Sequence, residues 1–107
     1  MTAEARYFPR ARLDLIEQAD YLAEQASTEV AERFLASTER TVDELLEMPR
    51  MGRIWEGLQA ETQNIRIWRV RDFPKILIFY RIETFGICVV RVLHGARDLP
   101  SLMKDYL

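Results

Sequence analysis

The side chains that could do chemistry in this sequence are arginines and a single histidine, gathered in the second half of the chain. If the strand-like runs there pair side by side, several arginines share one face of a sheet, and the histidine ends the last strand. The set consists of Arg66, Arg81, Arg91, His94 and Arg97. Guanidinium forks bind carboxylate or phosphate oxygens and stabilise developing negative charge. A histidine beside them could transfer a proton.

A simpler interpretation of the same residues stays open. The arginines could pair with acidic residues of the same chain, and the histidine could satisfy a turn. Structural ion pairs are common, and a lone histidine is more often structural than catalytic. The pattern alone favours this second interpretation.

Other kinds of chemistry find no support. A metal site needs three or four converging ligands, and the chain has one histidine and one cysteine. Cys88 lies in an apolar run, which predicts an inert core thiol, and a single cysteine fits a reducing cytoplasm. No serine lies in a nucleophile elbow, and the four scattered glycines exclude a phosphate-binding loop. We therefore expect no metal and no cofactor.

Charge is divided unevenly along the chain. Residues 1–49 carry 5 arginines and 11 acidic residues, whereas residues 50–107 carry 10 basic and 6 acidic residues. The basic half could therefore meet an acidic partner. The overall net charge of −2 argues against general nucleic-acid binding, which needs many unpaired cations. The longest apolar run, Ile76–Tyr80, is too short to cross a membrane.

Helical periodicity dominates the first half of the chain. A short strand is predicted over residues 4–8, a helix over 10–26 and a second helix over 28–47, with Ser27 as its N-cap and Pro49 near its end. The tiny connection makes the two helices an antiparallel hairpin. On the first helix, the apolar stripe is expected to face inward. Its acidic residues, Asp14 among them, are expected to face solvent.

Three strand-like runs follow, at residues 65–70, 76–82 and 87–93. Short links make them antiparallel. In the last run, one set of alternating side chains is expected under the helices, namely Cys88, Val90 and Val92. In the run 65–70, the apolar residues fall on both faces, so the pattern does not decide which face meets the helices.

The predicted fold is a single α+β domain over residues 1–107, with the order β-α-α-β-β-β. The helix hairpin should pack on one face of a mostly antiparallel sheet of about four strands.

Several motifs then resemble one family. They are Ala11-x-x-Asp14-Leu15 with Tyr21, Leu45-x-x-x-Pro49-x-x-Gly52, and the ending Val92-Leu93-His94-Gly95-Ala96-Arg97-Asp98-Leu99. Their order and spacing resemble the ParE/RelE superfamily of bacterial toxins over about residues 5–100. The resemblance implies a small cytoplasmic toxin of a type II toxin–antitoxin pair, bound and neutralised by a cognate antitoxin in a hetero-oligomer.

The resemblance leaves two activities in competition. ParE-type members poison DNA gyrase, with no established catalytic residue, and RelE-type members cut mRNA on the ribosome. The segment 50–63 lacks the lysines typical of RelE-type toxins, and the ending at His94 is similar to ParE. We therefore expect a gyrase inhibitor, with the arginine and histidine set binding the target and no sequence-specific nucleic-acid binding. The alternatives are an mRNA endonuclease with Arg66, Arg81 and His94 as catalytic residues, or a non-toxic binding module.

Antitoxin contacts are expected at Trp55, Leu58 and Trp68. Tryptophan is favoured at binding hot spots, and these residues flank an irregular segment. The alternative is that they belong to the core.

Overall fold

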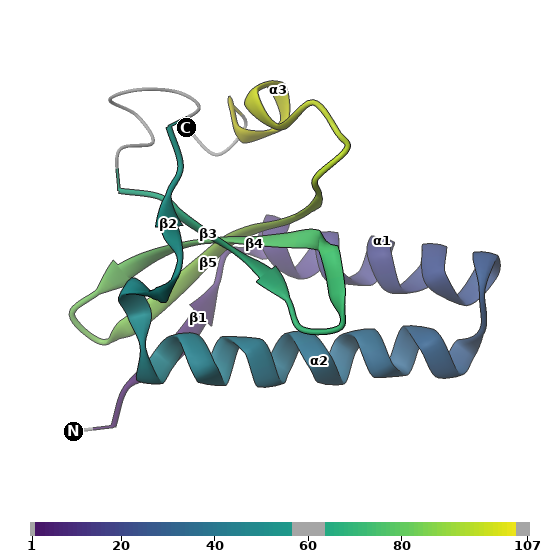
Figure 1. Ribbon diagram of the computed structural model, residues 1–107, viewed down its shortest axis with the longest axis horizontal. Coiled ribbons are helices and arrows are strands. Elements are labelled where there is room, and N and C mark those ends of the chain that lie inside the picture. Colours follow the sequence, from purple (N-terminus) through teal and green to yellow (C-terminus); the bar gives the residue numbers. More distant parts are fainter. Residues whose placement is uncertain (1, 57–63, 105–107) are drawn as a thin grey trace.

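The computed structural model describes residues 2–56 and 64–104, and its elements follow the predicted order (Figure 1). They are β1 (Glu4–Tyr7), α1 (Pro9–Gln25), α2 (Thr28–Glu47), the 3-10 helix η1 (Pro49–Met51), β2 (Arg53–Ile54), β3 (Arg66–Val70), β4 (Phe73–Glu83), β5 (Gly86–His94) and α3 (Leu99–Lys104). The described strands form one sheet in the order β1-β5-β4-β3-β2. Only the β1–β5 pair is parallel, so the predicted α+β fold is confirmed, with the short β2 as an additional fifth strand.

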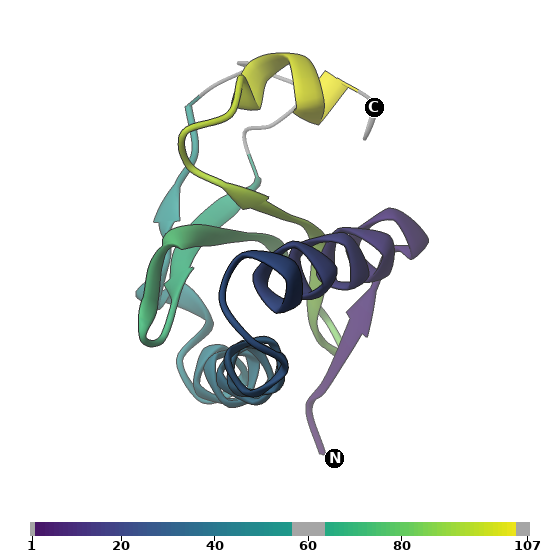
Figure 2. The ribbon, with the colours of Figure 1, turned by 90° about the vertical axis from the view of Figure 1, so that its right-hand side faces the viewer.

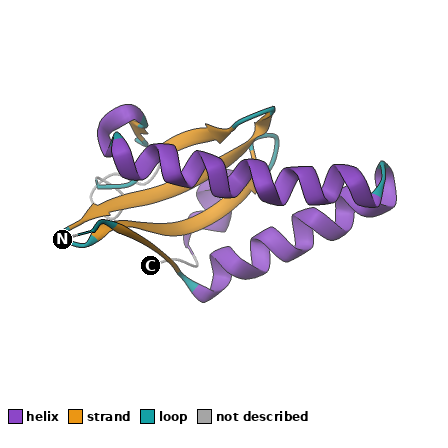
Figure 3. Ribbon diagram, turned by 90° about the horizontal axis from the view of Figure 1, so that it is seen from below, coloured by secondary structure: helices purple, strands orange, loops and turns teal. Residues whose placement is uncertain are grey.

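The helix hairpin lies along one face of the sheet, as Figure 3 shows from below. Ser27 caps α2 because its Oγ accepts a hydrogen bond from the Val30 N–H at 3.1 Å. The bounds of α2 match the prediction, and α1 begins one residue earlier than expected, at Pro9. Proline suits the first turn of a helix, where its missing N–H costs nothing. Among the described residues, none of the helices has the length and apolar character needed to span a bilayer.

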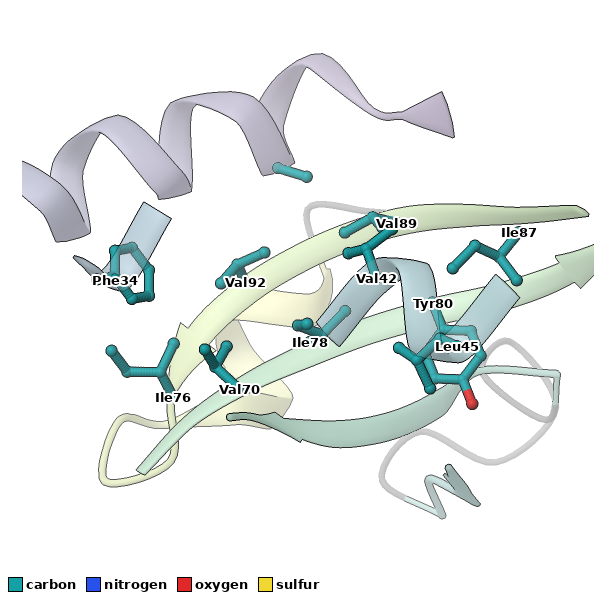
Figure 4. Close-up of a cluster of buried hydrophobic side chains, with 11 residues drawn as sticks. Phe34, Val42, Leu45, Val70, Ile76, Ile78, Tyr80, Ile87, Val89 and Val92 are labelled. Atoms are coloured by element: carbon teal, nitrogen blue, oxygen red, sulfur yellow. The ribbon is translucent and has the colours of Figure 1, made fainter. Parts of the chain in front are cut away.

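A first apolar core fills the space between the hairpin and the sheet (Figure 4). Phe34, Val42 and Leu45 of α2 point toward side chains from the central strands, including Ile78. The ring of Phe34 meets that of Phe73 edge to face, with centroids 5.5 Å apart. Neither helix would persist alone in water, so this burial stabilises both.

A second core covers the opposite face of the sheet, where α3 lies (Figure 2). Met103 of α3 is fully buried there, and Leu99 and Leu102 pack against the same cluster. The sheet is therefore apolar on both faces. This second apolar face occupies the side on which the sequence predicted a surface of arginines.

The prediction for the faces of β5 is wrong for two of its three residues. Val92 belongs to the helix-side core, but Cys88 and Val90 belong to the second core. The cause is a register shift in β4–β5 pairing: Phe79 pairs with Arg91 and Tyr80 pairs with Val89. One extra residue on β5 reverses the alternation of its side chains beyond that point.

The faces of β3, which the sequence left open, are settled by the two cores. Trp68 and Val70 lie on the helix side, and Ile65 and Ile67 lie on the other side.

Candidate functional site

Arg91 lies inside the protein, in contact with Asp14 of α1. Its Nε donates to Asp14 Oδ2 at 2.8 Å and its Nη2 donates to Oδ1 at 3.1 Å, so the pair is bidentate. Its Nη1 donates to the Leu102 carbonyl of α3 at 2.8 Å. Both side chains of the pair are 2% exposed. The structure therefore gives Arg91 the role of joining α1, β5 and α3, and its charge is balanced internally.

The prediction that Asp14 faces solvent is wrong, and the end of β1 explains why. β1 pairs with β5 only as far as Tyr7 and Val89, so the edge of β5 beyond that point needs another partner. Asp14 Oδ2 supplies it by accepting from the Val92 N–H at 3.0 Å. The sequence held one signal for this burial: Asp14 follows the buried Ala11 by three residues, which places it on the inward stripe of α1.

Arg66 and Arg81 do come together, in a cleft at one end of the sheet. The cleft has a volume of about 530 Å³, and its described lining is Arg50, Ile54, Asn64, Arg66, Arg81, Ile82 and Glu83. Arg66 Nη1 donates to the Gly52 carbonyl at 2.7 Å, and Arg81 Nη2 lies 3.1 Å from Glu83 Oε1. The described lining thus contains three arginines and one carboxylate.

His94 and Arg97 line a different cleft, between α1, the β3–β4 turn and the end of β5. It has a volume of about 760 Å³, and Tyr21, Phe73 and Lys75 also line it. His94 Nδ1 accepts a hydrogen bond from the Ala96 N–H at 3.1 Å. This bond orients the ring within the turn that ends β5, which is the structural role that the sequence left open for the histidine.

The sheet register separates these two clefts. His94 pairs with Ile76 near the start of β4, whereas Arg81 lies five residues further along that strand. At about 3.3 Å per residue, this spacing amounts to roughly 16 Å. The structure therefore divides the predicted set three ways: Arg66 with Arg81, His94 with Arg97, and Arg91 inside the protein.

The two tryptophans predicted to bind an antitoxin lie in different surroundings. Trp55 is 8% exposed and packs edge to face on Phe79, with centroids 5.3 Å apart, so it is part of the second core. Trp68 is half-buried on the helix side of β3, and the guanidinium of Arg69 lies 5.1 Å from its ring centroid. Leu58 lies outside the described residues.

An exposed apolar surface, not predicted from the sequence, lies next to the arginine cleft. Met48 is 62% exposed, Ile54 48% and Ile82 40%. Beside the arginine cleft lies an apolar hollow of about 440 Å³, which is lined by Met48, Pro49, Arg50, Met51 and Ile82. It shares Arg50 and Ile82 with the arginine cleft, so the two adjoin. The sequence offered one signal, because Ile54 and Ile82 each follow an arginine near the end of a strand. Periodicity alone does not distinguish such an isoleucine from a core residue.

Tyr80 fixes the wall of this region from inside the protein. Its hydroxyl donates to the Pro49 carbonyl at 2.6 Å and accepts from the Gly52 N–H at 3.0 Å. Burial raises the pKa of Tyr80, although the Gly52 hydrogen bond and nearby Arg66 oppose the shift. A side chain at position 52 would collide with this hydroxyl, which explains why glycine suits the position.

The described residues offer no constellation for metal or thiol chemistry. Within residues 2–56 and 64–104, no three His, Cys, Asp or Glu side chains are grouped so that they could hold a metal ion. Cys88 is buried, and burial raises the pKa of its thiol despite the opposing charge of Arg81. A buried thiol of raised pKa is a poor nucleophile. The candidate binding sites are therefore the two clefts and the apolar surface beside the arginine cleft.

Comparisons with known proteins agree with this architecture. A solved structure of the chromosomal ParDE TA system from P. aeruginosa is similar, with a TM-score of 0.71 and 16% sequence identity over 87% of this chain and 96% of that chain. No curated protein sequence matches the chain. Residues 5–99 match the sequence model of the ParE toxin of the type II toxin–antitoxin system parDE. That match covers most of the chain, which therefore belongs to the ParE toxin family.

Proposed function

We propose that this protein is a toxin that inhibits DNA gyrase in the cytoplasm and is neutralised by a cognate antitoxin. Membership of the ParE toxin family supports the proposal, because ParE-type toxins are gyrase poisons held inactive by their antitoxins. The arginines of the second half would then serve binding. Those best placed for contact with the target are Arg66 and Arg81 in one cleft and Arg97, with His94, in the other.

We favour inhibition over RNA cleavage because His94 lies apart from the arginine cleft. A general acid or base must lie within hydrogen-bond reach of the group to which it transfers a proton. The sheet register holds His94 roughly 16 Å along β4 from Arg81, at about 3.3 Å per residue. Arg91, which would otherwise add positive charge, is neutralised by Asp14. This arrangement supports binding of a macromolecule over cleavage of a phosphodiester.

Antitoxin binding is proposed at Trp68, whose ring is half-buried on the surface of β3, and at Leu58. Trp55, also predicted to bind the antitoxin, is left out of this surface because it packs on Phe79 in the second core, on the opposite face of the sheet, and is 8% exposed.

A supercoiling assay with purified gyrase, run beside a ribosome-dependent mRNA cleavage assay, tests the function. The expected result is accumulation of cleaved gyrase–DNA complexes with intact mRNA. Cleaved mRNA that becomes intact again in a His94→Ala variant would instead identify a nuclease. Normal growth of a host that makes the protein without its antitoxin would indicate a non-toxic binding module.

A further inference from the structure

The cleft of Arg50, Arg66 and Arg81 continues into the apolar hollow beside it. Arg50 and Ile82 line both the cleft and the apolar hollow, so one ligand could occupy the two together. Isolated exposed apolar residues are ordinary, but a cluster rimmed by polar groups marks an interaction site. Met48, Ile54 and Ile82 form such a cluster, each with at least 40% of its surface exposed.

The charge of the cleft is only partly balanced from within. Glu83 pairs with Arg81, and the two side chains are 31% and 35% exposed. Arg66 donates to a neutral carbonyl, that of Gly52. Among the described residues, neither Arg50 nor Arg66 has a carboxylate within ion-pair distance. Among the described lining residues, three guanidinium groups and one carboxylate sum to a charge of +2, on a chain whose net charge is −2.

The lining also discriminates between a peptide and a nucleic acid. Proteins that bind single strands stack bases on aromatic side chains, and duplex binding relies on many cations along the phosphates. The described lining of the two hollows contains no aromatic residue, and the surface beside the arginines is aliphatic or thioether. Such a surface complements a polypeptide in which aliphatic side chains neighbour carboxylates.

From this complementarity we infer that the composite surface of Met48, Arg50, Ile54, Arg66, Arg81 and Ile82 binds an acidic, aliphatic segment of the target protein, and not its DNA. The inference rests on the proposed function, because it names the part of gyrase that the arginines contact. The aliphatic side chains of the segment would lie over Met48 and Ile82. Its carboxylates would receive hydrogen bonds from the guanidinium groups of Arg50 and Arg66.

Direct binding to purified gyrase in the absence of DNA tests the inference. The main variant is Arg50→Glu, because Arg50 is exposed and makes no ion pair in the described part of the chain. Arg40→Glu is the matched control, since Arg40 is exposed on α2 outside the cleft and undergoes the same charge reversal. Met48→Ser removes the apolar contact alone. A circular dichroism melt of each variant checks that it remains folded.

We expect Arg50→Glu to weaken gyrase binding by at least about tenfold, Met48→Ser by about threefold, and Arg40→Glu by less than about twofold. Wild-type protein should not bind a 40-base-pair DNA duplex without gyrase. The inference would be overturned if wild-type protein binds and inhibits gyrase and folded Arg50→Glu binds gyrase with the same affinity. The proposed function would then remain intact. If wild-type protein binds DNA and Arg50→Glu does not, the cleft is a DNA-binding site and the inference is wrong. If Arg50→Glu binds the cognate antitoxin more weakly and gyrase equally well, the cleft is an antitoxin-binding site and the inference is again wrong. Wild-type protein that neither binds nor inhibits gyrase would overturn both proposals.

Discussion

Arg91 and Asp14 lie 77 positions apart in the sequence and form a bidentate ion pair in which both side chains are 2% exposed. The carboxylate also accepts from the Val92 N–H, and the guanidinium also donates to the Leu102 carbonyl. The pair therefore links the helix hairpin, the central sheet and α3. It satisfies backbone groups where β5 has lost its neighbour β1.

Replacing Asp14 with Ala should destabilise the fold strongly. The change leaves a buried guanidinium without its anion and the Val92 N–H without its acceptor, which together should cost about 3–5 kcal/mol of unfolding free energy. Urea denaturation followed by circular dichroism measures it. Asp20→Ala on the same helix is the control, because Asp20 is exposed and its loss should change stability by less than about 0.5 kcal/mol. Equal midpoints for the two variants would contradict a structural role for the pair.

Tyr80→Phe should destabilise the protein and change its response to alkali. The variant loses the hydrogen bonds to Pro49 and from Gly52, which should cost about 1–3 kcal/mol. Burial raises the pKa of Tyr80, so above about pH 10 the unfolded chain loses this proton first and the stability of the fold falls as pH rises.

Stability measured from pH 8 to 11 should therefore fall less steeply in Tyr80→Phe than in wild type. Tyr7 and Cys88, whose pKa values burial also raises, keep the remaining slope. Parallel curves for the two proteins would show that the Tyr80 hydroxyl does not titrate differently on folding.

The helices were predictable because their signals are local. Ser27 directly precedes α2, Pro49 follows its last residue by two positions, and the apolar spacing lies between them. The faces of β5 were not predictable. Nearly every residue from Ile87 to Leu93 is apolar, so the extra residue in the β4–β5 register leaves no trace in the hydropathy pattern.

The candidate site was predictable only in part for a related reason. Arg66 and Arg81 come from adjacent strands, and pairing rules bring them near each other. The burial of Arg91 depends on its pairing with a carboxylate in the other half of the chain, and a single sequence does not reveal such a pairing. The apolar surface at Met48 and Ile82 arises where η1 meets the end of β4, which is a tertiary arrangement without a sequence motif.

Gly52→Ala and Gly95→Ala should behave very differently although the substitution is the same. A Cβ at position 52 would meet the Tyr80 hydroxyl and come within 2.8 Å of the Ile67 carbonyl, whereas at position 95 its nearest neighbours are 3.5 Å away. We expect Gly52→Ala to lose about 1–3 kcal/mol and Gly95→Ala to change stability by less than about 0.5 kcal/mol. Thermal melts compare them. A harmless Gly52→Ala would mean that η1 shifts away from the sheet at little cost.

Trp68→Ala should separate antitoxin binding from folding. Trp68 is half-buried at the surface of β3, so its truncation should cost less stability than truncation of the buried Trp55, which we expect to lose about 3–5 kcal/mol. If Trp68 is a hot spot, its loss should weaken antitoxin binding by about 2 kcal/mol or more, which is close to thirtyfold. Titration calorimetry with the cognate antitoxin measures the affinity, and urea denaturation measures the stability of the same preparation. Loss of affinity no larger than the loss of stability would reject Trp68 as an interface residue and place it, like Trp55, with the core.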